Sequence, residues 1–246
     1  MLVRSALFNA WFLAFTFAMS SAGIPLRWMA PWRTAALARH WARGVLGGLR
    51  VLCGIDYVLL GRENLPAQGP MLVAAEHQSA FDTVVWHALV QSPVYVVKKE
   101  LMRLPLFGPL LRRGGQIGID RTAGAAALRG LVRQTQRAAG EGRPVVIFPQ
   151  GTRIEPGNRV PLQPGIAAQS ARTGLPVIPV ATDSGRFWGR RAFRKRPGTI
   201  RIVVCPQIPP GLPRAVLLAR IEQAWQSAET HTAETHVAET GGQPCG

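Results

Sequence analysis

A histidine followed by a carboxylate gives this chain the chemistry of a general base. His77 and Asp82 lie in the segment EHQSAFD (76–82). A carboxylate that accepts a hydrogen bond from one imidazole nitrogen fixes the tautomer and leaves the other nitrogen free to take a proton. Such a base contributes roughly 10²–10⁴-fold to the rate of attack by a hydroxyl group. The pair therefore predicts activation of an alcohol.

The same segment carries a pattern typical of a helix start. Ser79 as the N-cap and Asp82 three residues later form a capping box, in which the carboxylate only satisfies backbone N–H groups. Both interpretations use one geometry, because the loop places His77 just before the helix and the first turn brings Asp82 back beneath it. A His-x4-Asp pattern arises often by chance, so it needs a second motif.

The second motif is FPQGTR (148–153), which ends a predicted strand. Gly151 permits a sharp turn and a close approach of the backbone to a ligand. Arg153 can hold a phosphate through two parallel N–H bonds, which lysine cannot reproduce. The alternative is an ordinary turn at a strand end with a surface arginine.

The charge balance favours anionic partners. The 246 residues include 29 Lys and Arg against 13 Asp and Glu, which gives a net charge of +16. A basic run interleaved with aromatic residues at 186–201 is also typical of nucleic-acid binders, or of a solvated surface loop. The apolar N-terminus beside basic flanks favours a membrane surface with anionic lipid instead, and we expect no nucleic-acid partner.

The first 54 residues predict two membrane-associating helices. Residues 5–26 are uncharged and apolar, and a helix there is at the short edge of a membrane span. It spans once, embeds in the interface, or is a cleaved signal peptide. Residues 32–53 form a basic amphipathic helix that lies on lipid or packs on the domain as a surface helix. The downstream lysine/arginine bias predicts an inner-membrane protein with its main domain on the cytoplasmic face.

Residues 55–226 predict one layered α/β domain, because short apolar strands alternate with helices. The tail, residues 227–246, repeats Ala-Glu-Thr and is predicted to be disordered. Three widely separated cysteines form neither a disulfide framework nor a metal site, and we expect Cys53 and Cys205 to be buried. We expect strands at 57–60, 71–75, 94–97, 145–148, 177–180 and 200–204, and helices at 83–90, 123–139, 166–172 and 212–226.

Four ordered blocks resemble the PlsC-type acyltransferases, the family of 1-acyl-sn-glycerol-3-phosphate (lysophosphatidic acid) acyltransferases. The resemblance covers roughly residues 55–210 and implies a mixed sheet flanked by helices, docked on a membrane by the N-terminal helices. The blocks are HQSAFD (77–82), the run from KKEL (98–101) through PLFG (105–108) to IDR (119–121), FPQGTR (148–153) and LPVIPVA (175–181).

The resemblance also implies a reaction. An acyl group passes directly from a thioester, acyl-CoA or acyl carrier protein, to the free hydroxyl of 1-acyl-sn-glycerol 3-phosphate, and phosphatidic acid forms. In that scheme His77 deprotonates the hydroxyl, and Asp82 orients His77. Lys98 and Arg153 bind the phosphate. No metal ion or other cofactor is implied.

The family pattern assigns Gly151 and Thr152 to the shape of the phosphate pocket, and Ser79 and Gln150 to the shape of the substrate site. Gln150 is a departure, because the family usually has Glu there. If that carboxylate only holds a loop, Gln150 can replace it; if it balances the arginine, this site is more positive and the acceptor differs. Glu76 also departs, since Asn is common before the histidine.

These departures leave two alternatives open beside the main hypothesis. The acceptor of the same reaction is glycerol 3-phosphate, another lysophospholipid or a lyso-ornithine lipid. In the other alternative, the chain is a non-catalytic protein that binds anionic lipid. The richness in Ala and Arg indicates a bacterial source.

Overall fold

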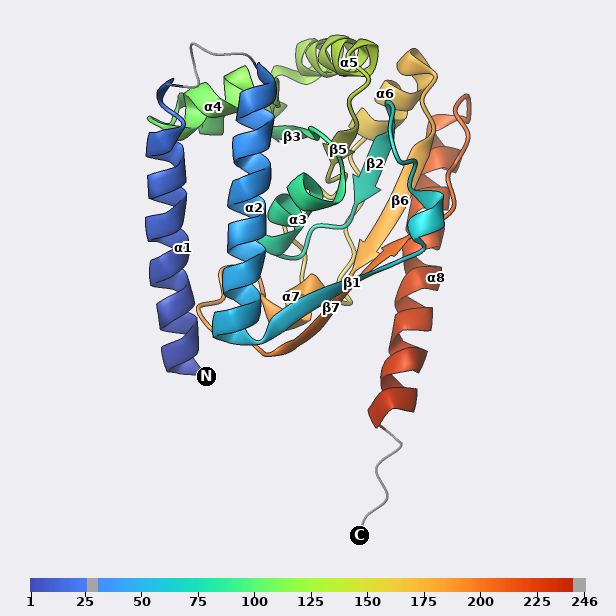
Figure 1. Ribbon diagram of the computed structural model, residues 1–246. Coiled ribbons are helices and arrows are strands. Elements are labelled where there is room, and N and C mark those ends of the chain that lie inside the picture. The colour runs from blue at the N-terminus through green and yellow to red at the C-terminus, as the bar shows by residue number, and fades with distance from the viewer. Residues whose placement is uncertain (26–30, 241–246) are drawn as a thin grey trace.

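One mixed sheet forms the centre of the protein (Figure 1). The computed structural model describes residues 1–25 and 31–240. Within them, seven strands lie in the order β1-β7-β6-β2-β5-β3-β4. Neighbouring strands are parallel except for the antiparallel pair β6–β7, as the predicted fold class requires. The strands are β1 (Ile55–Leu60), β2 (Leu72–Ala75), β3 (Val94–Lys98), β4 (Ile117–Ile119), β5 (Val145–Ile147), β6 (Val177–Thr182) and β7 (Gly198–Val204).

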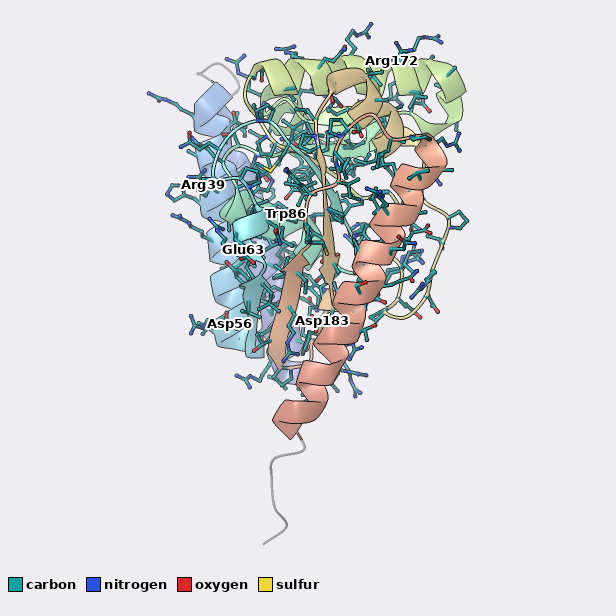
Figure 2. The ribbon with its side chains drawn as sticks, turned by 90° about the vertical axis from the view of Figure 1, so that its right-hand side faces the viewer. Arg39, Asp56, Glu63, Trp86, Arg172 and Asp183 are labelled. Carbon is teal, nitrogen blue, oxygen red and sulfur yellow. The ribbon has the colours of Figure 1, made fainter. Side chains whose placement is uncertain are left out.

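Helices cover both faces of this sheet, so its central strands are apolar throughout. In β2, Val73 and Ala75 pack into the core shared with α1, α2 and α3, while Leu72 and Ala74 pack toward α5, α6 and α8. Figure 2 shows Trp86 of α3 in the interior and Arg172 of α6 at the outer surface. The helices are α1 (Leu2–Ala22), α2 (Pro31–Cys53), α3 (Phe81–Leu89), α4 (Phe107–Arg113), α5 (Gly124–Gly140), α6 (Gly165–Thr173), α7 (Ser184–Phe187) and α8 (Arg214–Thr240).

The two N-terminal helices run antiparallel along one side of the molecule (Figure 1). Two glycines of α2 allow their close approach. A Cβ atom at Gly48 would overlap the ring of Trp11, and one at Gly44 would overlap the ring of Phe15. These two rings stack with centroids 4.8 Å apart. Small residues on one helix thus accommodate aromatic residues on the other.

The helix α1 also packs on the α/β domain. Phe8 is fully buried and meets Trp188 edge-to-face, with centroids 5.3 Å apart. The ammonium group of Lys195 lies over both rings, 5.6 Å from Phe8 and 5.2 Å from Trp188. The backbone N–H of Lys195 donates to the Ser5 hydroxyl at 3.0 Å. The helices α1 and α2 therefore share a core with the α/β domain.

The other side of α1 carries exposed apolar side chains, including Leu7, Leu13 and Phe17. By length and composition alone, α1 could cross a membrane. An exposed apolar stripe on a helix whose opposite side is packed is typical of a helix that contacts lipid.

The structure corrects the prediction for the tail, because α8 continues through 227–240 to Thr240. Ala and Glu are strong helix formers. The packed start of α8, with Leu217, Ile221 and Trp225 in the core, supplies the first turns on which a helix extends. Residues 241–246 lie outside the described part of the chain. Cys53 and Cys205 are buried free thiols, as predicted.

Replacing Phe8 with alanine tests whether α1 is part of the fold. We expect Phe8→Ala to lower the free energy of unfolding by about 3–5 kcal/mol, because it removes a fully buried ring. Leu13→Ala, on the exposed side of the same helix, is the control and should change it little. Thermal unfolding in detergent measures both; equal small effects would show that α1 does not pack on the domain.

Candidate active site

The sheet order brings the two sequence motifs together. His77 follows β2 and the segment 148–153 follows β5, and these parallel strands are neighbours. Their carboxyl ends therefore meet at one edge of the sheet, where α/β proteins bind ligands. Two hydrogen bonds join the loops: His77 N–H donates to Gln150 Oε1 at 2.7 Å, and Ile154 N–H donates to the His77 carbonyl at 2.7 Å.

Asp82 is the most densely bonded side chain of the site. Its Oδ2 accepts the backbone N–H groups of Gln78 and Ser79, each at 2.7 Å, and lies 3.2 Å from Nδ1 of His77. Its Oδ1 accepts the Ser184 hydroxyl at 2.6 Å. A buried carboxylate with this many donors is held in one orientation. A neutral His77 ring that carries its proton on Nδ1 donates to it, which leaves Nε2 unprotonated.

Ser79 takes part in the helix start and not in the cavity wall. Its hydroxyl accepts the N–H of Phe81 at 3.1 Å, while its own N–H donates to Asp82. The bond from the Ser79 N–H to Asp82 is the return bond that the capping interpretation predicts, although α3 begins at Phe81 with Ala80 as its N-cap and without a side-chain cap hydrogen bond. The base interpretation of His77 stays a prediction. Ser79 is fully buried and is absent from the described lining of the cavity.

A cavity of about 850 Å³ opens beside His77. Lys98, Gly151, Thr152 and Arg153 line it as well, so the structure brings four predicted phosphate-site residues to the predicted base. Lys98 ends β3, which neighbours β5. His77 and Arg153 thus follow β2 and β5, and Lys98 ends β3; these three strands are consecutive in the sheet.

Aromatic rings form one wall of this cavity. The His77 ring stacks on Phe148 at 4.2 Å between centroids. The next rings continue this row. The centroids of Phe148 and Tyr95 are 6.3 Å apart, those of Tyr95 and His87 are 5.0 Å apart, and those of His87 and Trp41 of α2 are 6.3 Å apart. Burial, and to a lesser extent the charges of nearby arginines, lower the pKa of His87 to about 4. His87 is therefore uncharged near pH 7.

The rest of the lining is largely apolar and comes from helices on two sides. The N-terminal helices contribute Met19, Leu37 and Trp41, and α4 and α5 contribute Leu110 and Leu128. Among the described lining residues there is no Asp or Glu. The cavity thus combines basic groups near a histidine with an apolar volume of ligand size.

Gln150 lies behind the cavity and does not line its described part. It is buried, and its side-chain oxygen holds the N–H of His77. An amide oxygen accepts this bond as a carboxylate does. Gly151 follows with a φ of 74°, a left-handed conformation that favours glycine. Of the two interpretations of Gln150, the geometry supports the one in which this position holds a loop.

Arg153 is half-buried at the cavity. Burial lowers the pKa of its guanidinium group; the nearby Asp82 raises it, and Arg190 lowers it. The group remains charged, since an arginine pKa starts far above neutrality. Partial burial strengthens its attraction for an anion, because water screens the charge less.

Comparison with known proteins agrees with this geometry. A family model described as Acyltransferase matches residues 58–183. The chain is 32% identical over 206 residues to the 1-acyl-sn-glycerol-3-phosphate acyltransferase of Pseudomonas aeruginosa, which covers 83% of this chain and 80% of that protein. The chain belongs to the acyltransferase family. The resemblance inferred from the four sequence blocks is thereby confirmed.

Two further proteins are similar to this chain over most of its length. The human 1-acyl-sn-glycerol-3-phosphate acyltransferase beta is 25% identical over 180 residues, 72% of this chain and 65% of that protein. The crystal structure of PlsC, the 1-acyl-sn-glycerophosphate acyltransferase from Thermotoga maritima, covers all of both chains with a TM-score of 0.77. Its identity is 18%, so this likeness concerns the fold.

Several residues of the site were not predicted from the sequence. Trp41, His87 and Tyr95 line the cavity, and no motif in the sequence marked them as residues of a site. Arg190 and Arg191 also line it. They belong to the basic run at 186–201, for which a solvated loop was one interpretation. Their position at the cavity depends on tertiary contacts, which the sequence pattern does not give.

Glu76 of this acyltransferase lies under the base loop. It is buried, and its Oε2 accepts the N–H of Thr182 at 2.9 Å. Burial raises the pKa of Glu76 to about 8; the Thr182 N–H lowers it, and the charges of Glu229 and Asp82 raise it further. The carboxyl group is therefore mostly protonated at pH 7. It is then neutral, like the asparagine that this family commonly has at the position.

Glu76→Gln tests whether the protonation of Glu76 makes the stability of the acyltransferase depend on pH. The pKa of Glu76 rises on folding from 4.5 to about 8, so the folded state holds the proton more tightly and wild-type stability falls as pH increases between these values. A glutamine has no such dependence. We expect the midpoint of thermal unfolding of the variant, relative to wild type, to rise between about pH 5 and pH 9. A difference that stays constant with pH would contradict this assignment.

Proposed function

We propose that this acyltransferase moves a fatty acyl group from acyl-CoA or acyl carrier protein to the free hydroxyl of 1-acyl-sn-glycerol 3-phosphate, giving phosphatidic acid. One observation carries the proposal. His77, which is held by Asp82, lines a single cavity with Lys98 and Arg153, and that cavity continues into apolar surface. A base, a phosphate site and room for an acyl chain are thus in contact. The names of the relatives support the same acceptor.

In the proposed mechanism, Nε2 of His77 takes the hydroxyl proton of the acceptor as its oxygen attacks the thioester carbonyl. The new ester C–O bond forms and the C–S bond breaks. The departing thiolate takes the proton from the imidazolium ring. Asp82 stabilises that ring while it is charged and keeps Nε2 directed into the cavity. The acyl group moves directly, without a covalent acyl-enzyme.

Lys98 and Arg153 bind the acceptor phosphate in this proposal. Arginine offers two parallel N–H donors, and lysine adds a point charge. The turn at Gly151 and Thr152 brings backbone close to the same oxygen atoms. An acceptor without phosphate, such as a lyso-ornithine lipid, has less use for these cations, so the geometry favours a phosphate-bearing acceptor.

The apolar part of the cavity accommodates an acyl chain. The helices α1 and α2 form one of its walls, and the outward side of α1 bears apolar side chains. We infer that α1 embeds in the cytoplasmic side of the inner membrane without crossing it. The support for embedding is that the other side of α1 packs on α2 and on Trp188, which leaves one side for lipid.

Acyl transfer by the purified chain in detergent tests the proposal. Lysophosphatidic acid, glycerol 3-phosphate and a lyso-ornithine lipid are offered separately, with acyl-CoA and then with acyl carrier protein. We expect turnover on lysophosphatidic acid that falls by about 10²–10⁴-fold in His77→Ala, which loses the base. His40→Ala, an exposed histidine of α2, is the control. Turnover on another acceptor only, or equal activity in His77→Ala, would refute the proposal. Binding of anionic lipid with no turnover would favour the non-catalytic alternative.

Arg153→Ala separates phosphate recognition from chemistry. We expect KM for lysophosphatidic acid to rise about 10- to 100-fold, because hydrogen bonds between charged groups are lost. The KM for the acyl donor should change little. Arg172→Ala, at an exposed arginine of α6, is the matched control. An unchanged KM for the acceptor would place the phosphate elsewhere.

A further inference from the structure

A tight turn after α7 presents two arginines to the cavity. The N–H of Ala192 donates to the Gly189 carbonyl at 3.1 Å, so Arg190 and Arg191 occupy the central positions of a β-turn. Arg191 has a φ of 55°, which is uncommon for a residue other than glycine. Strained positions of this kind often occur where a side chain must be directed to a site.

The segment that carries this turn is anchored on both sides. Before it, Trp188 is buried and packs edge-to-face on Phe8 and Phe12 of α1. After it, Lys195 is bonded to Ser5 of α1, and the N–H of Arg196 donates to the Phe187 carbonyl at 2.9 Å. The turn is thus held against the catalytic domain and α1, in contrast to a freely moving surface loop.

Arg190 shares the cavity with the catalytic groups. It lines the same cavity as His77, Lys98 and Arg153, and its charge is close enough to lower the pKa of Arg153. The structure gives Arg190 no hydrogen bond or ion pair with another described residue. Two neighbouring guanidinium groups that form no ion pair with a described carboxylate repel each other, and a bound anion would offset that repulsion.

We propose that Arg190 completes, with Arg153 and Lys98, a three-cation subsite that selects a phosphomonoester over a phosphodiester. This inference rests on the proposed function, because it specifies the acceptor class for the same cavity. A phosphomonoester exposes three terminal oxygens and bears nearly two negative charges at pH 7, its second pKa being about 6. A phosphodiester head group exposes two such oxygens and bears one charge. The third cation therefore benefits the monoester more.

Direct binding tests this subsite independently of turnover. Dodecyl phosphate and dodecyl methyl phosphate share one chain and differ in charge, and their Kd values are measured by calorimetry on the full chain in detergent. In Arg190→Gln we expect about tenfold weaker binding of the monoester. The diester should lose about threefold, because Coulomb energy is proportional to charge. Arg190→Lys, which keeps the charge, should stay within about threefold of wild type for both.

Arg194→Gln is the matched control. Arg194 is an exposed arginine of the same segment and does not line the described cavity. Its loss removes the same charge outside the described cavity lining, so both Kd values should stay within about twofold of wild type. Thermal unfolding verifies that each variant is folded.

Two results would overturn the inference. In the first, Arg190→Gln binds dodecyl phosphate as tightly as Arg194→Gln does. In the second, Arg190→Gln raises the Kd of the monoester and of the diester by the same factor. A third would assign Arg190 to the donor, namely a raised KM for acyl-CoA with unchanged binding of dodecyl phosphate. Absence of turnover on lysophosphatidic acid in wild type would refute the proposed function while leaving these Kd values interpretable. The two failures are therefore distinguishable.

Discussion

The carboxylate of Asp82 is the interaction on which the rest of the site depends. It closes the turn between β2 and α3 through two N–H groups, orients His77, and accepts the hydroxyl of Ser184. Ser184 begins α7, and the segment after α7 packs against α1 through Trp188. One buried acceptor with several hydrogen bonds thus connects His77 to the segment that reaches the N-terminal helices. A buried polar group is tolerated only when it is hydrogen-bonded in this way, which constrains this whole region of the chain.

The N-terminal helices have two roles in this account. Their inner side completes the cavity with Trp41 and Met19, and their outer side carries the apolar residues of α1. The proposed membrane anchor and the acyl-binding wall are therefore the same pair of helices. A lipid substrate would then have a short path from the bilayer to His77. The glycines at 44 and 48 keep the pair close enough to serve both roles.

Much of the fold and of the candidate site could be predicted from the sequence, because the motifs that mark them are short and local. His77, Asp82, Lys98 and Arg153 stand in short motifs, and the predicted helices and strands lie near the observed ones. The wall residue His87 could not be predicted, since sheet order and helix packing create its neighbourhood. The strand β4 and the helix α4 are too short to show a hydrophobic periodicity, so they were not predicted. In the tail, composition indicated disorder, but helix propensity and the packed start of α8 prevailed.

The ¹⁵N chemical shifts of the imidazole nitrogens show whether Asp82 fixes the tautomer of His77. The spectrum is recorded on histidine-labelled protein in detergent, in the pH range where the ring is neutral, and the signals are assigned by their absence in His77→Ala. We expect a protonated Nδ1 and an unprotonated Nε2, because the Asp82 carboxylate lies 3.2 Å from Nδ1. A proton on Nε2 in the resting enzyme would contradict it, since that nitrogen could not take the acceptor's proton.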